Sequence, residues 1–159
     1  MKEGYKEITL LQQREIEARV LAPLIRAFCR EFGEERALEV VRRAIQEVAR
    51  DSGRAAATAY GEGLASLKEN CVKKFNEGGA LTVETRRDDD ECCAFDVTRC
   101  KFSELYKELG CGDIGAVLSC ERDAAFLEGF DGSLELVRSE TLMEGGARCD
   151  FCYRKREAR

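Results

Sequence analysis

The sequence predicts an α+β fold, in which N-terminal helices pack on a four-stranded, mainly antiparallel sheet with two inserted helices. Apolar residues recur every four positions in the first half of the chain, the period of a helix face, and every second position in later segments, the period of a strand. The change falls at a turn sequence, Glu77-Gly78-Gly79. The 159 residues, 44% of them hydrophobic, suffice for one domain with its own core. We expect a single domain with a helical part at about 9–76 and a sheet and site part at about 80–155.

The first predicted helix carries apolar residues four positions apart, and we expect that face to lie in the core. Thr9 and Gln12 have the spacing of a capping box at its start, and Gly33 is its expected C-terminal cap. Pro23 lies inside the pattern, so it either kinks this helix or begins a second one at its first turn. The apolar face consists of Ile16, Val20, Leu24, Phe28 and Phe32.

Two further helices are predicted before the sheet. One runs from about Glu34 to Asp51 and ends at Ser52-Gly53, and a weaker one spans roughly Gly61 to Phe75. Both repeat apolar residues at helical spacing, which favours buried stripes. The stripes are Leu38, Val41, Ile45 and Val48 in the first of these helices, and Leu64, Leu67, Cys71 and Phe75 in the second.

The second half alternates as strands do. Strands are predicted at 81–86, 92–98, 134–139 and 149–153, and the two inserted helices at 101–109 and 113–126. Phe95 and Val97 share one face of the second strand, and Cys149, Phe151 and Tyr153 share one face of the last.

Composition excludes several classes of function. The net charge of −5 argues against nucleic acid as a partner, and neither a signal peptide nor about 18 consecutive apolar residues is present, so we expect a cytoplasmic protein without a membrane partner. The nine cysteines are an odd number without an export signal, which favours free thiols. The chain has no histidine, so Ser-His-Asp and Cys-His mechanisms are excluded.

The C-terminal half contains a set of motifs that together resemble a known family. The second predicted strand is followed by Cys100, the short helix contains Tyr106, the next helix contains Cys120-x-x-Asp123, and the last strand begins Cys149-Asp150-Phe151. This arrangement resembles the L-2-amino-thiazoline-4-carboxylic acid hydrolase family over nearly the whole chain. The fold is also similar to the 4-vinyl-reductase-type domain, a small-molecule-binding module.

The resemblance implies hydrolysis of a C–N bond in a small cyclic amidine or thiazoline carboxylate, which gives a carbamoyl-cysteine. Such chemistry needs a nucleophile at the amidine carbon, a carboxylate that moves protons, and an arginine that holds the substrate carboxylate. Asp123 follows Cys120 by three residues, so the two share one helical face. The positions that match the family are Cys100, Cys120, Asp123 and Cys149 as catalytic candidates, and Arg138, Arg99, Tyr106 and Asp150 as substrate-binding candidates.

Other interpretations of the same residues stay open. The thiols are equally typical of core residues. No cofactor is expected; if zinc binds, Cys100, Cys120 and Cys149 are its expected ligands. Besides a hydrolase with a small-molecule substrate, the sequence is compatible with a sensor module without turnover or a redox-active thiol protein, and with a homo-oligomer. The chain departs from the family pattern at Cys152, which stands where an arginine is expected, and at the additional Cys92, Cys93 and Cys111.

Overall fold

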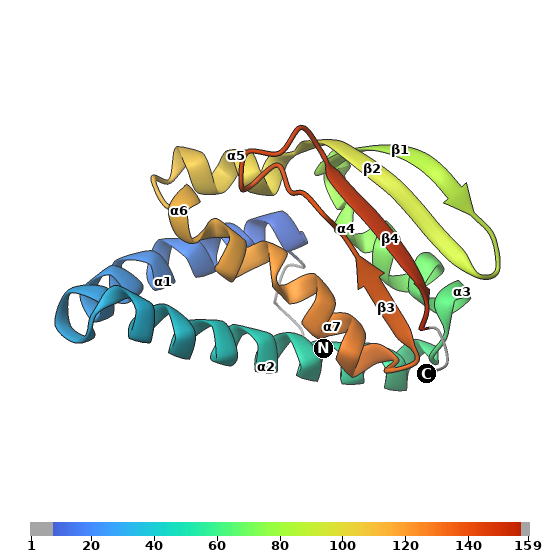
Figure 1. The fold of residues 1–159 in the computed structure, drawn as a ribbon, viewed down its shortest axis with the longest axis horizontal. Helices are drawn as coiled ribbons and strands as arrows, with labels where there is room; N and C mark the ends of the chain where they lie inside the picture. The colour runs from blue at the N-terminus through green and yellow to red at the C-terminus, as the bar shows by residue number, and fades with distance from the viewer. Residues whose placement is uncertain (1–7, 157–159) are drawn as a thin grey trace.

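The computed structural model describes residues 8–156, in which a group of helices covers one face of an antiparallel sheet (Figure 1). The long helices are α1 (Leu10–Phe32) and α2 (Glu34–Tyr60), and the shorter ones are α3 (Leu64–Leu67), α4 (Lys73–Phe75), α5 (Lys101–Glu108), α6 (Gly112–Gly115) and α7 (Arg122–Phe130). The strands are β1 (Leu81–Asp88), β2 (Cys92–Cys100), β3 (Leu134–Val137) and β4 (Cys149–Lys155), in the order β1-β2-β4-β3. All three strand pairs are antiparallel. The predicted α+β class is confirmed.

The start of α1 follows its sequence signals. Thr9 Oγ1 accepts a hydrogen bond from the Gln12 backbone N–H at 3.2 Å, and Gln12 Oε1 accepts one from the Thr9 N–H at 2.9 Å. This capping box satisfies two N–H groups that a helix start leaves without partners. Pro23 lies inside α1, which continues without a break, so no second helix begins there. Gly33 follows the helix with φ 87, a conformation that favours glycine.

We expected the apolar face of α1 to lie in the core, and that prediction was wrong, because the face is exposed. Ile16 is 56% exposed and Phe32 60%, whereas Ala18 and Ile25 are 1% and 2% exposed. Residues seven positions apart stay on one side of a helix, but a row of residues four apart drifts around it. The buried side of α1 is therefore the one that carries Ala18 and Ile25. Val48 of α2, also expected in the core, is 54% exposed.

Helix α2 continues nine residues past the predicted end. Gly53 does not stop the helix; it lies inside α2, where it allows close contact with α7. A Cβ at Gly53 would lie 2.1 Å from the Phe126 carbonyl oxygen of α7. Gly129 of α7 is in the reciprocal position, since a Cβ there would lie 2.1 Å from the Arg50 carbonyl oxygen. The two helices thus touch through their backbones, which fixes α7 relative to α2.

The predicted strand faces are confirmed. Phe95 and Phe151 are register partners on β2 and β4, with ring centroids 5.1 Å apart. Val97, Cys149 and Tyr153 are buried on the same side of the sheet, toward the helices. The third strand is shorter than predicted, so that residues 138 and 139 follow it in an irregular segment.

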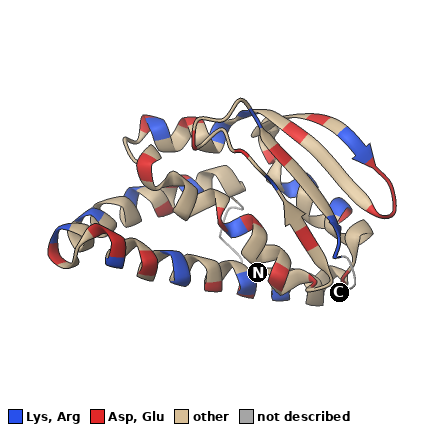
Figure 2. Cartoon of the chain, viewed as in Figure 1, with Lys and Arg blue, Asp and Glu red and all other residues tan. Residues whose placement is uncertain are grey.

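The charged residues lie mainly on the outer surface. Figure 2 shows acidic and basic residues interspersed along α2. Several form ion pairs one helical turn apart, such as Arg54 with Asp51. Within residues 8–156, no helix is long and apolar enough to cross a membrane.

Candidate functional site

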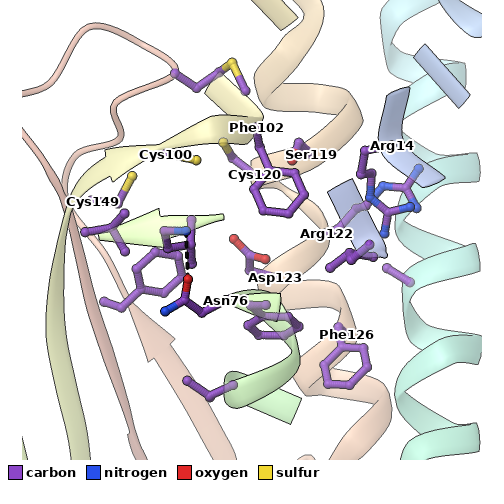
Figure 3. Close-up of a pocket in the computed structure, with 18 of the residues that line it drawn as sticks. Arg14, Asn76, Cys100, Phe102, Ser119, Cys120, Arg122, Asp123, Phe126 and Cys149 are labelled. Carbon is purple, nitrogen blue, oxygen red and sulfur yellow. Dashed lines mark hydrogen bonds between the residues drawn. The ribbon is translucent and has the colours of Figure 1, made fainter. Parts of the chain in front are cut away.

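A cavity of about 530 Å³ lies between the helices and the sheet. This volume is in the range of small-molecule sites. Its walls are mainly apolar and include five phenylalanines: Phe75, Phe95, Phe102, Phe126 and Phe151. Figure 3 shows its polar side chains, with Asp123 between the thiols of Cys100, Cys120 and Cys149 on one side and Arg14 and Arg122 on the other.

Five of the eight site residues named from the sequence line this cavity, namely Cys100, Cys120, Asp123, Arg138 and Cys149. They come from the ends of secondary-structure elements. Cys100 is the last residue of β2 and Cys149 the first of β4, Arg138 follows β3, and Asp123 is in the first turn of α7. Cys120 ends a π-helical turn, Ala116–Cys120, between α6 and α7. Such turns are frequent at functional sites.

The three thiols differ in what surrounds them. Burial raises the pKa of all three, and for Cys120 it does so most strongly, with the charge of Asp123 acting in the same direction. At Cys100 the backbone N–H groups of Phe102 and Ser103, in the first turn of α5, oppose this rise. Cys149 Sγ accepts a hydrogen bond from the Leu142 backbone N–H at 3.2 Å. Cys100 and Cys149 therefore have local support for a thiolate.

Asp123 is held by Arg138. Arg138 Nη1 donates to Asp123 Oδ2 at 2.7 Å, and Nη2 donates to the Cys120 carbonyl at 2.9 Å. The guanidinium also lies over the Phe151 ring, 4.9 Å from its centroid. Burial raises the pKa of the Asp123 carboxyl, and Arg138 opposes that shift. Because both terminal nitrogens of Arg138 donate to protein groups, its geometry suits orienting Asp123 rather than holding a substrate carboxylate.

The remaining three residues named from the sequence lie outside the cavity lining. Arg99 is exposed and pairs with Glu104 at 2.7 Å. Tyr106 is 1% exposed and lies in the core between α1 and α5, where burial raises its pKa to about 12. Asp150 accepts hydrogen bonds from Ser139 and Glu140. Neighbouring residues on a strand face opposite sides of the sheet, so Arg99 and Asp150 point away from the side of Cys100 and Cys149.

Four charged residues of the cavity were missed in the sequence: Arg14, Glu17, Lys73 and Arg122. Lys73 begins α4, and its exposed side chain pairs with Glu69. Arg14 and Glu17 belong to α1, and Arg122 directly precedes Asp123. The available signal was that Arg14 lies on the same side of α1 as Ala18 and Ile25, a position unusual for an arginine. Arg14, Glu17 and Arg122 come together only through the contact of Arg122 with Glu17, which are 105 positions apart in the sequence.

The additional cysteines lie apart from this cluster. Cys92 and Cys152, on adjacent strands, have their Sγ atoms 3.4 Å apart. Cys93 and Cys111 are buried, and burial raises the pKa of Cys93 to about 11. In the described part of the chain, no group of three or more Cys, Asp and Glu side chains has an arrangement that holds a metal ion.

Comparison with known families places the chain. A family model described as L-2-amino-thiazoline-4-carboxylic acid hydrolase matches residues 13–153. The chain belongs to this family. Among proteins with curated descriptions, none matches it. The match to the thiazoline carboxylate hydrolase family runs from α1 into β4, so it includes every charged residue and thiol of the cavity described above.

Proposed function

We propose that this protein is a hydrolase that opens a small cyclic amidine carboxylate of the 2-amino-thiazoline-4-carboxylate type, giving a carbamoyl-cysteine. The observation that carries the proposal is the gathering of three thiols and the Asp123 carboxylate at one apolar cavity, in a chain of this family. An amidine carbon is electrophilic, and the apolar walls strengthen electrostatic interactions with it.

Cys100 is the proposed nucleophile. It ends β2 directly before α5, where the N–H groups of Phe102 and Ser103 favour the thiolate. Among residues 8–156, no backbone N–H donates to the Cys120 thiol, and burial together with the charge of Asp123 keeps it neutral. Cys149 is the second candidate because of the hydrogen bond from Leu142.

Asp123 is the proposed base. Its charge interacts with all three thiols, and a pKa raised by burial makes it a stronger proton acceptor than an exposed carboxylate. In the first step the Cys100 proton passes to Asp123 while sulfur bonds to the amidine carbon. A ring bond to that carbon then breaks, and the departing ring atom takes the proton. Water next attacks the same carbon while Asp123, ionised again, takes one of its protons; the bond to the Cys100 sulfur breaks, and Asp123 passes that proton to the departing thiolate. The sum of the steps is the addition of one water to the ring.

The test is turnover of 2-amino-thiazoline-4-carboxylate by the purified protein, followed by mass spectrometry. Cys100→Ser and Asp123→Asn are expected to lower kcat by about 100-fold or more. The matched control is Cys29→Ser, since Cys29 is a half-buried thiol of α1 outside this cavity, and it should leave kcat unchanged. A thiol reagent identifies the broken bond, because C–N cleavage gives an S-carbamoyl product and C–S cleavage releases a thiol. Binding without turnover by the wild type would refute the hydrolase and favour the sensor module.

A further inference from the structure

Arg14 and Arg122 meet at one wall of the cavity through a single carboxylate. Arg14 Nη1 lies 2.8 Å and Arg122 Nη2 2.9 Å from the same atom, Glu17 Oε2. The side chains of Arg14 and Arg122 are only 13% and 11% exposed. Two nearly buried guanidinium groups therefore share one negative charge.

The charges of the cavity do not balance. Arg138 is matched by Asp123 in an ion pair of 2.7 Å. Arg14 and Arg122 have only Glu17 between them, so this group carries one excess positive charge in mainly apolar surroundings. Burial and the neighbouring Arg14 lower the pKa of Arg122, as expected for like charges held close together out of water. A single bound anion would neutralise the group.

The two guanidinium groups also retain donors. Arg122 Nε donates to the Leu118 carbonyl at 2.6 Å, which fixes its plane. Within residues 8–156, no hydrogen bond occupies Nε or Nη2 of Arg14, or Nη1 of Arg122. Planar donors of this kind suit the two oxygens of a carboxylate.

We propose that Arg14 and Arg122 form the subsite that binds the carboxylate of the ligand, and that Glu17 limits it to a single negative charge. The inference rests on the proposed function, because it identifies the residues that bind the carboxylate of the proposed substrate. Asp123 lies in the same cavity between the two arginines and the three thiols (Figure 3), so a carboxylate held by the arginines places the ring toward the thiols. The ligand class is a monocarboxylate whose single charged oxygen pair is attached to a compact ring.

The test compares binding of three probes by titration calorimetry. Thiazolidine-4-carboxylate has the carboxylate but no amidine carbon, 2-amino-2-thiazoline has the amidine but no carboxylate, and inorganic phosphate carries more charge. The wild type should bind the first probe at least about tenfold more tightly than either of the others.

Two substitutions should change this affinity in opposite directions. Arg14→Gln is expected to weaken binding of thiazolidine-4-carboxylate by about 10- to 100-fold. Glu17→Gln removes the competing carboxylate and should tighten it, an outcome that a merely structural role would not produce. Arg19→Gln makes the same charge change at an exposed residue of α1 paired with Glu15, and should leave binding unchanged.

The results separate this inference from the proposed hydrolase. Equal affinity of Arg14→Gln, Arg19→Gln and the wild type would overturn the carboxylate subsite, even if turnover were observed. Carboxylate-dependent binding lost in Arg14→Gln would support the subsite, even if the wild type showed no turnover. With an active enzyme, Arg14→Gln should raise KM with little change in kcat, because this contact lies away from the reacting carbon.

Discussion

Replacement of Gly53 by alanine is expected to destabilise the protein, although alanine favours a helix by about 1 kcal/mol over glycine. The added Cβ would lie 2.1 Å from the Phe126 carbonyl oxygen and 2.7 Å from the Phe130 nitrogen. Both are backbone atoms of α7, so no side-chain rotation relieves the overlap, and α7 must move by about 1 Å or more to restore van der Waals contact. Overpacking of this kind costs about 1–3 kcal/mol. From the upper end of that range, a net loss of about 2 kcal/mol remains.

Urea denaturation followed by circular dichroism measures this loss, and it corresponds to a melting temperature lower by about 4–8 °C for a domain of this size. Gly132→Ala is the control, because a Cβ at Gly132 meets no heavy atom within 4 Å, and it should change stability by less than about 0.5 kcal/mol. A Gly53→Ala protein as stable as the wild type, or more stable, would refute the backbone contact between α2 and α7.

Two further changes probe the side of α1 that is buried and the segment after β3. Ile25→Ala should lower the free energy of unfolding by about 2–5 kcal/mol, because the Ile25 side chain is buried. The control is Leu24→Ala, one position away and 47% exposed, which should change the free energy of unfolding by about 0.5 kcal/mol or less. Equal losses for the two variants in urea denaturation would contradict this orientation of α1. Asp150→Asn should cost about 1 kcal/mol near neutral pH, through weakened hydrogen bonds from Ser139 and Glu140. Burial acts to raise the pKa of Asp150, but those hydrogen bonds outweigh it and hold the pKa at about 2, below the ordinary 3.8. The wild type should therefore keep this stability above about pH 4 and lose it as the pH falls through 2. The difference between the two proteins should shrink over this range in acid denaturation, and a difference as large at pH 2 as at neutral pH would contradict the assignment.

Local patterns accounted for much of the fold. The capping box at Thr9 and the alternation around Phe95 and Phe151 depend on residues close in sequence, and the structure has both. The end of α2 was misplaced at Gly53, since a glycine that stops a helix and one that admits another helix look alike in a sequence. The exposed row from Ile16 to Phe32 was misassigned for a similar reason, because helical spacing identifies a face but not what covers it.

For the candidate site, too, the sequence indicated only part of what the structure brings together. Family motifs in the second half of the chain named Cys100, Cys120, Asp123, Arg138 and Cys149, which the structure brings to one cavity. In the last predicted strand, alternation alone places Asp150 on the face opposite Cys149. Arg99 and Cys100 lie beyond the predicted second strand at 92–98, so alternation did not assign their sides.

The amino-acid sequence by itself determined the α+β class, the family and the thiols and carboxylate of the cavity, because these follow from local periodicity and from motifs of a few residues. Only the tertiary structure decided which arginines face the cavity. Arg138 turns to Asp123, and Arg14 and Glu17 of α1 meet Arg122 across 105 positions of sequence. The physical reason is that a charge imbalance depends on which groups lie close together in the folded chain. The spacing of residues within α1 or α7 does not show how the two helices lie relative to each other.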